Sequence, residues 1–264
     1  MKDYKLIATD IDGTLFDNNH NFDKEKLNSL IEKLHRRNIK FVVASGNTYN
    51  HLERLFKEVT GIDAIMVENG GQLVIADTTV YERVFSNQEA QKLIEILIKN
   101  SSINNIYVSG KKATYTTDKS NLEGNFYYDN LKYIANYVDI QDEIFKINIL
   151  LNNEMLDETV NDLNKINSKM LYAAVSGHGS IDIVPQNTNK GIALKELASH
   201  FNISTEQMMA FGDNKNDLEM IQVAGLGIAM RNAVPLIKEK ANAITQYDND
   251  NEGVLKEIKT IFNI

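Results

Sequence analysis

The sequence of 264 residues contains no cysteine and only two prolines. Because there is no thiol, disulfide bonds and thiolate metal sites are excluded, and any bound metal must use other ligands. The first proline, Pro185, lies in the segment VPQNTNKG, where we expect a hinge between two parts of the chain.

Positive charge and long apolar runs are also scarce. The formal net charge is −8 and the sequence pI is near 5.2. Sequence-independent binding of nucleic acid requires a basic face, so nucleic acid is not an expected partner. An anionic substrate must be held by local positive groups. The first apolar stretch is too short for a signal peptide, and no later one is long enough to span a bilayer. We therefore expect a cytoplasmic protein with no membrane partner; the composition indicates no oligomeric state.

Six short apolar runs have the continuity of strands that are buried on both faces. They alternate with helical patterns, such as the stripe formed by Leu27, Leu30, Ile31 and Leu34. Strand, helix, strand in this order predicts an α/β fold with a doubly wound parallel, Rossmann-like core. The runs are KLIAT (5–9), KFVVAS (40–45), AIMVEN (64–69), QMMAFG (207–212), GLGIAM (225–230) and NAIT (242–245).

The middle of the chain has a different pattern, in which apolar and polar residues alternate. Phe145, Ile147 and Ile149, for example, alternate with Lys146 and Asn148. This is typical of an antiparallel sheet with one covered face and one polar face. Two helical segments are expected to cover it. We therefore predict an inserted α+β cap domain at residues 84–185, with its two helices at 87–100 and 153–167. The core domain is formed by residues 1–83 and 186–264.

The segment DIDGTL places two carboxylates, Asp10 and Asp12, directly after the first apolar run. Like charges this close disfavour joint ionisation, so a divalent cation, a phosphoryl group or both would resolve the conflict. Asp10, Asp213 and a backbone carbonyl near Asp12 would offer a hard cation its oxygen ligands.

Three further loops carry polar residues where an expected strand ends or a helix begins. Ser45 and Gly46 follow the second strand, Lys190 opens a helix, and GDNKND (212–217) follows a later strand. A serine hydroxyl with backbone N–H groups at a helix start forms a phosphate cradle, and a lysine supplies a compact positive charge. Since open α/β sheets build their sites at the carboxyl ends of the strands, we expect these loops to converge.

Each of these features also has an ordinary structural explanation. A D-x-D pair is commonly a solvated turn, Ser45 and Gly46 match a helix N-cap, and Lys190 fits an exposed helix start. GDNKND by itself is an acidic turn. The functional interpretation depends on finding all four segments in one chain and in this order.

The four segments resemble the motifs of the haloacid dehalogenase-like superfamily, and the match covers the whole chain. DIDGTL resembles the first motif, Ser45 the second, Lys190 the third and GDNKND the fourth. The insertion between Ser45 and Lys190 is similar to the C2-type cap of the Cof-type phosphatases. The resemblance implies a Mg²⁺-dependent phosphatase that hydrolyses small phosphate monoesters, sugar phosphates above all, through an aspartyl-phosphate.

Carried over residue by residue, the resemblance implies Asp10 as the nucleophile and Asp12 as general acid and then general base. The implied phosphate ligands are Ser45, Gly46, Lys190 and Asn216. The implied metal ligands are Asp10, Asp12 (through its carbonyl) and Asp213. The supporting residues are Asn214, Asp217 and Thr14, which we expect to hold Asp12.

Two positions depart from the commonest family pattern. Asn47 stands where many relatives have arginine, and Arg231 stands where a small residue is usual.

In such an architecture the cap would close over the site, exclude water and select the substrate. His178, Tyr115, Glu123 and Lys146 are candidates, from their positions in the chain, for contact with a small phosphorylated metabolite. Two other functions remain open. A phosphomutase on this fold would keep every motif, whereas a sensor that binds a phosphorylated ligand without turnover would not need both aspartates of DIDGTL.

Overall fold

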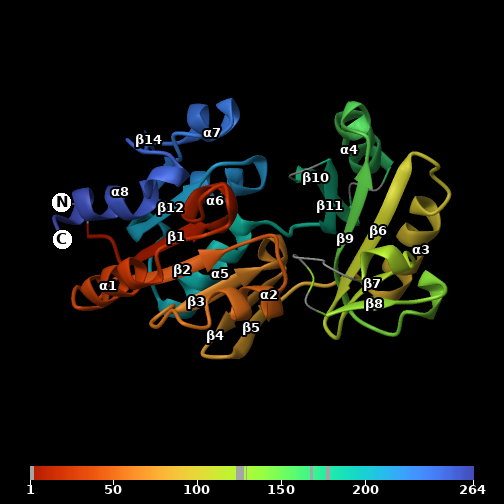
Figure 1. Ribbon diagram of the computed structural model, residues 1–264, viewed down its shortest axis with the longest axis horizontal. Coiled ribbons are helices and arrows are strands. Elements are labelled where there is room, and N and C mark those ends of the chain that lie inside the picture. The colour runs from red at the N-terminus through yellow and green to blue at the C-terminus, as the bar shows by residue number, and fades with distance from the viewer. Residues whose placement is uncertain (1–2, 123–127, 129, 167–168, 177–178) are drawn as a thin grey trace. The chain divides into compact units, whose positions relative to one another are not determined.

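A computed structural model describes residues 3–122, 128, 130–166, 169–176 and 179–264 (Figure 1). The chain forms two compact units. The first unit comprises Met1–Gly46, Glu53–Tyr81 and Asn189–Ile264, and the second comprises Asn47–Leu52 and Glu82–Thr188.

The first unit is built on an eight-stranded sheet with the strand order β14-β13-β12-β1-β2-β3-β4-β5. The six strands from β14 to β3 run parallel, and each corresponds to one of the six predicted apolar runs. Leu6, Ile7 and Ala8 of the central strand are completely buried, as expected for a strand with both faces covered. The strands are β1 (Leu6–Asp10), β2 (Lys40–Ala44), β3 (Ala64–Val67), β4 (Gln72–Ile75), β5 (Thr78–Glu82), β12 (Met208–Gly212), β13 (Leu226–Ala229) and β14 (Ala243–Ile244).

The edge formed by β4 and β5 departs from the predicted parallel sheet. Strand β4 runs antiparallel to β3, so that Val67 pairs with Gln72 across a tight turn at Glu68–Gly70. Strand β5 is mostly exposed and carries no buried apolar run. The apolar pattern that predicted the other strands is therefore missing from β5, whereas β4, with Leu73 and Val74 buried, has a short apolar run that the six predicted strands do not include.

The helices of the first unit pack in two groups, α1 with α8, and α5 with α6 and α7 (Figure 1). The predicted stripe of α1 is buried, and Asp23 caps this helix by accepting a hydrogen bond from the backbone N–H of Lys26. Asn189 caps α5 in the same way, at the helix that begins with Lys190. The bounds are α1 (Lys24–His35), α2 (Tyr49–Leu55, which contains a boundary between the units), α5 (Lys190–Phe201), α6 (Leu218–Val223), α7 (Pro235–Lys240) and α8 (Gly253–Phe262).

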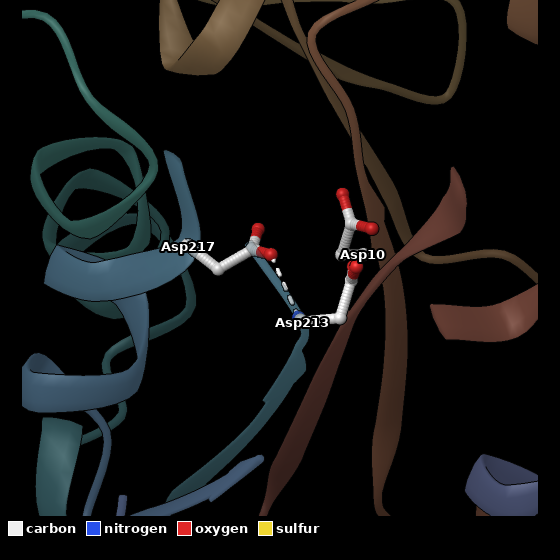
Figure 2. Close-up of side chains that lie close together, drawn as sticks. All are labelled: Asp10, Asp213 and Asp217. Atoms are coloured by element: carbon white, nitrogen blue, oxygen red, sulfur yellow. Dashed lines mark hydrogen bonds between the residues drawn. The ribbon is translucent and has the colours of Figure 1, made fainter. Parts of the chain in front are cut away.

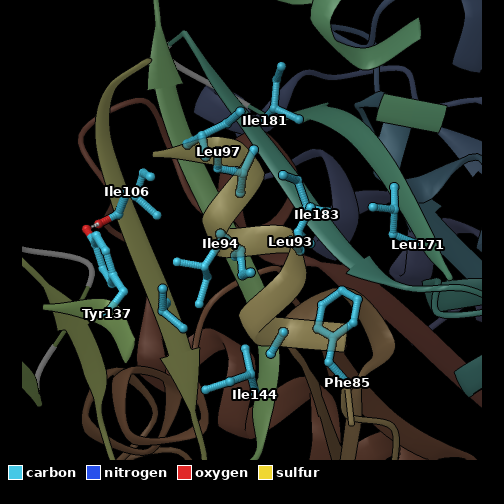
Figure 3. Packing of buried hydrophobic residues seen from close by; sticks show 14 of the residues in the cluster. Phe85, Leu93, Ile94, Leu97, Ile106, Tyr137, Ile144, Leu171, Ile181 and Ile183 are labelled. Atoms are coloured by element: carbon cyan, nitrogen blue, oxygen red, sulfur yellow. Dashed lines mark hydrogen bonds between the residues drawn. The ribbon is translucent and has the colours of Figure 1, made fainter. Parts of the chain in front are cut away.

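The second unit contains a six-stranded sheet with the order β10-β11-β9-β6-β7-β8, antiparallel except for the parallel pair β7–β8. One face packs against α3 and α4, as predicted, and Figure 3 shows Leu93, Ile94 and Leu97 of α3 among the strand residues. The elements are α3 (Asn87–Leu97), β6 (Ile103–Gly110), β7 (Thr114–Thr116), β8 (Leu131–Tyr133), β9 (Ile144–Leu151), α4 (Leu156–Ile166), β10 (Leu171–Ser176) and β11 (Ser180–Pro185).

The alternation in β9 holds for most of the strand but not for its first residues. Ile147 and Ile149 belong to the apolar cluster, whereas Phe145 does not, and Ile144 takes its place. The register against β6 shifts between Ser109 and Gly110, which leaves one extra residue in β9 and reverses the order of its faces.

Short helical turns complete both units; those outside the site are Lys119–Asn121, Tyr137–Asp139, Asn153–Met155 and Thr205–Gln207. In the part of the chain that the structure describes, no helix combines the length and hydropathy needed to cross a membrane.

Candidate active site

The DIDGTL segment brings the end of β1 to the middle of the parallel sheet, between β2 and β12. Asp10 is the last residue of the strand and is buried, with 5% of its surface exposed. The turn at Ile11–Leu15 follows directly, and Gly13 adopts φ +76°, which favours glycine. A Cβ atom at Gly13 would lie 2.6 Å from Oδ2 of Asp213, so only glycine lets this turn pass so close to the end of β12.

Lys190 is completely buried and binds two carboxylates. Its ammonium group donates to Oδ1 of Asp10 and, at 2.6 Å, to Oδ1 of Asp217. Burial alone would lower the pKa of Lys190, but the two aspartates raise it above its ordinary value. The lysine is therefore a fixed cation inside the protein, and the alternative of an exposed helix start is wrong.

The GDNKND loop is held together by Asp217, which is also completely buried. Its Oδ2 atom accepts hydrogen bonds from the backbone N–H groups of Asp213 (3.0 Å) and Asn214 (3.1 Å). The side chain of Asn214 in turn accepts from the N–H of Lys215 at 2.8 Å. Asp217 thus fixes the loop from within, which orients Asp213 at the carboxyl end of β12.

Three carboxylates meet at this point, with one oxygen each from Asp10, Asp213 and Asp217 within 4.8 Å of one another (Figure 2). With Lys190 as their cation, three negative charges face one positive charge, which leaves two negative charges if all are ionised. Burial and then Asp217 raise the pKa of Asp10 well above its usual range. The same two causes raise the pKa of Asp213 to about 7.

This charge imbalance fits a divalent cation, whose two positive charges would balance the cluster. Both oxygens of Asp217 already accept hydrogen bonds, from Lys190 and from backbone N–H groups. Asp10 and Asp213 are therefore better placed than Asp217 to serve as ligands. Hard carboxylate oxygens are the donors that Mg²⁺ prefers.

We expect Mg²⁺ to stabilise the protein more at about pH 8 than at about pH 5.5. Because the pKa of Asp213 is raised to about 7, the folded metal-free protein binds more protons than the unfolded chain between the ordinary aspartate value and pH 7. Its stability should fall as pH rises through this window, and a bound cation should remove that penalty. The melting temperature with and without Mg²⁺ at both pH values measures the effect, and an equal shift at both would contradict it. The Asp213→Asn variant, which lacks the titrating group, should lose most of the difference.

Thr14 was predicted to hold Asp12, and this prediction is wrong. Its hydroxyl donates to Oδ1 of Asp213 at 2.9 Å, because the turn at Gly13 directs it towards the end of β12. Asp12 is instead in contact with His20, whose Nδ1 atom lies 3.3 Å from Oδ1 of Asp12.

The loops after β2 and β12 are joined through a residue that the sequence did not single out. Asn69 donates its backbone N–H to the carbonyl of Ser45 at 3.1 Å, and its Oδ1 atom accepts from Nδ2 of Asn216 at 3.2 Å. Gly46 passes directly against the same side chain. Ser45 and Asn216, both predicted phosphate ligands, are thereby connected.

A second set of residues missed in the sequence holds the loop that follows DIDGTL. Asn232 donates to the carbonyl of Gly13 at 2.7 Å. Asn249 donates to the carbonyl of Phe16 at 3.0 Å and to Oδ1 of Asn18 at 3.1 Å. These asparagines lie more than two hundred residues away in the sequence, and their spacing carries no motif that would have predicted the contact.

The candidate cap residues have different outcomes. His178 and Glu123 lie outside the described residues. Tyr115 belongs to the apolar cluster of the second unit and donates to Oδ2 of Asp142 at 3.1 Å. Lys146 is buried, with its Nζ atom 3.8 Å from Oδ1 of Asp182. In the first unit, Arg231 is exposed and donates to the carbonyl of Gln246.

A sequence model of the haloacid dehalogenase-like hydrolases matches residues 7–258. The chain therefore belongs to this family, as its motifs predicted.

Several of its relatives are named as phosphatases. The 5-amino-6-(5-phospho-D-ribitylamino)uracil phosphatase YbjI of Escherichia coli is 30% identical, covering 97% of this chain and 96% of its own. The phosphatase YcsE of Bacillus subtilis, which is named for the same activity, is 28% identical over 97% of this chain and 95% of its own. The crystal structure of SMU.1108c from Streptococcus mutans superposes with a TM-score of 0.91 at 27% identity, covering 99% of this chain and 100% of that one. The family and these relatives support a phosphatase enzyme, as predicted.

Proposed function

We propose that this enzyme is a Mg²⁺-dependent phosphatase that hydrolyses small phosphate monoesters through an aspartyl-phosphate on Asp10. The observation that carries the proposal is the buried cluster at the ends of β1 and β12, in which Lys190 binds Asp10 and Asp217 beside Asp213. A carboxylate oriented by a lysine, next to further oxygen ligands for a cation, suits nucleophilic attack on a phosphoryl group.

In the first step, a carboxylate oxygen of Asp10 forms a bond to phosphorus while the bond from phosphorus to the ester oxygen breaks. Asp12 gives its proton to the departing oxygen, which leaves as the free alcohol. In the second step, a water oxygen attacks phosphorus, its proton passes to Asp12, and the bond from Asp10 to phosphorus breaks. Inorganic phosphate is released and both aspartates return to their starting states.

The other residues hold the reacting groups in place. Lys190 fixes the Asp10 carboxylate and supplies positive charge for the phosphoryl oxygens, with which Ser45, Gly46 and Asn216 would also form hydrogen bonds. Asp10, Asp213 and the backbone carbonyl of Asp12 would bind Mg²⁺. When bound, Mg²⁺ would neutralise charge on the phosphoryl group and align it with the nucleophile.

For the substrate, we propose a phosphorylated sugar or polyol. We take residues 84–185, within the second unit, as the substrate-specificity cap. The acidic net charge disfavours nucleic acid. We also propose a cytoplasmic location, where such metabolites are formed.

The relatives favour a second candidate within the same class. Two of them are named for a phosphoribitylamino-uracil, in which the phosphate is carried by a ribityl chain, itself a polyol. At 30% and 28% identity the reacting groups can be shared while the residues that recognise the rest of the substrate differ.

The test is a comparison of kcat/KM across hexose, pentose and polyol phosphates, the phosphoribitylamino-uracil, nucleotides, flavin mononucleotide and pyridoxal phosphate. We expect a sugar or polyol phosphate to be preferred by about tenfold or more, equivalent to ~1.4 kcal/mol of transition-state binding. Excess chelator should abolish turnover and added Mg²⁺ should restore it. A tenfold preference for a nucleotide or a cofactor phosphate over every sugar phosphate would contradict the proposed substrate class.

The same assays separate the alternative functions. A phosphatase releases free phosphate in equal amount to the alcohol. A phosphomutase would convert one sugar phosphate into another with little free phosphate, and a sensor would bind the ligand without turnover.

A further inference from the structure

The turn that joins β3 to β4 has an unusual backbone. Glu68, Asn69 and Gly70 all have positive φ, at 53°, 56° and 90°. A positive φ is uncommon for residues other than glycine, and asparagine is among those that tolerate it best. Successive residues in this conformation persist where the surrounding structure holds them, as it does at many functional sites.

The surroundings of this turn are three loops of the candidate active site. Towards β2, the backbone N–H of Asn69 donates to the carbonyl of Ser45 at 3.1 Å. A Cβ atom at Gly46 would lie 2.8 Å from Oδ1 of Asn69, so the absence of a side chain at Gly46 allows this approach. Towards β12, Oδ1 of Asn69 accepts a hydrogen bond from Nδ2 of Asn216 at 3.2 Å.

The third loop is the start of the helix that carries the buried lysine. A Cβ atom at Gly70 would lie 2.5 Å from the carbonyl oxygen of Asn189. Asn189 caps α5 by accepting from the N–H of Ile192 at 2.8 Å, and Lys190 is the first residue of that helix. The turn is therefore packed against the backbone of Asn189, the N-cap that fixes the start of α5 and with it the position of Lys190.

The turn at Glu68–Gly70 is thus the point where these three loops meet, and Asn69 at its centre is buried, with 7% of its surface exposed. We propose that Asn69 is a positioning residue for phosphate binding, which holds the amide of Asn216 and the backbone at Ser45 and Gly46 in one arrangement. This inference rests on the proposed function, because it takes those three residues as the phosphate ligands.

The positioning role predicts a specific kinetic signature. Groups that bind the phosphoryl oxygens hold the substrate, the transition state and free phosphate alike, so their misplacement weakens all three. Loss of such uniform binding raises KM and leaves kcat nearly unchanged. The inhibition constant of inorganic phosphate should rise in parallel with KM.

The Asn69→Gly variant tests this, because glycine keeps the positive φ and removes only the side chain. We expect KM for an aryl phosphate and the inhibition constant of inorganic phosphate to rise about tenfold, with kcat within about threefold. The Asn38→Gly variant is the matched control, since Asn38 also has a positive φ (56°) but is exposed and lies outside these loops. It should change none of these constants.

The Asn69→Asp variant provides a second test that does not alter side-chain size. A carboxylate oxygen can still accept from Asn216, but burial of its charge should lower the melting temperature, so the constants are measured well below that temperature. Its negative charge should repel phosphate and raise the inhibition constant at least as much as Asn69→Gly does. Native inhibition constants for phosphate in both Asn69 variants, or losses confined to kcat, would overturn the inference. If the native protein itself released no phosphate, the proposed function would fail instead.

Discussion

The Asp10→Asn variant is expected to lose turnover by roughly 10⁴-fold or more, the scale seen when a covalent nucleophile is removed. An amide oxygen does not attack phosphorus as a carboxylate does, so no phosphoryl-enzyme should form. The fold should survive, because the substitution removes one of the two uncompensated negative charges of the buried cluster. We expect the melting temperature of the metal-free variant to equal or exceed that of the native protein. Steady-state kinetics, intact mass after mixing with an aryl phosphate, and thermal melting measure these effects.

The Asp12→Asn variant is the matched control, since it makes the same change two residues away. It removes acid–base assistance only, worth typically about 10²–10⁴-fold. The loss should be smaller for an aryl phosphate, whose leaving group needs little protonation, than for an alkyl phosphate. A phosphoryl group should still be trapped on the Asp12→Asn protein. A trapped phosphoryl group on the Asp10→Asn protein would show that another residue is the nucleophile.

The parallel core could be predicted from the sequence because its strands are buried on both faces. Continuous apolar runs such as residues 207–212 leave little choice of structure when helical patterns lie between them. Strand β5 lacks that pattern, because an edge strand with exposed residues buries too little apolar surface for its sequence to be recognised as a strand. Strand β4 has a short buried apolar run that the six predicted strands do not include. The bulge that places Ile144 rather than Phe145 in the apolar cluster depends on pairing with β6, which local alternation does not encode.

The candidate site was predictable to the extent that its residues occupy the carboxyl ends of parallel strands. Asp10, Ser45 and Asp213 were singled out on that basis, and the structure places Asp10 and Asp213 in one cluster. The same rule applied to β3 would have pointed to Asn69, in the segment AIMVENGG, where an Asn-Gly pair marks a turn. The partner of Thr14 was not predictable, because it is set by the close approach of Gly13 to β12, a contact between segments 199 residues apart.

Lys190 has two roles. Its ammonium group stabilises the buried carboxylate cluster, and the reactivity of Asp10 depends on the same group. The Lys190→Met variant keeps a similar volume but leaves Asp10 and Asp217 without their cation in a buried site. Breaking a buried ion pair in this way typically costs about 3–5 kcal/mol of unfolding free energy. We expect a loss of this size, together with loss of turnover. The Lys40→Met variant is the control, because the pair of Lys40 with Asp63 is partly exposed and should contribute no more than about 1 kcal/mol.

A double variant separates the two roles of Lys190. Adding Asp217→Asn to Lys190→Met removes one of the two carboxylates that lost their cation, and an amide oxygen can still accept from the backbone of the GDNKND loop. We expect the double variant to unfold at higher denaturant concentration than Lys190→Met alone, because the uncompensated charge is smaller. Activity should stay absent in both, because no ammonium group remains beside Asp10. If the double variant were no more stable than the single one, charge balance would not explain why a lysine is buried here.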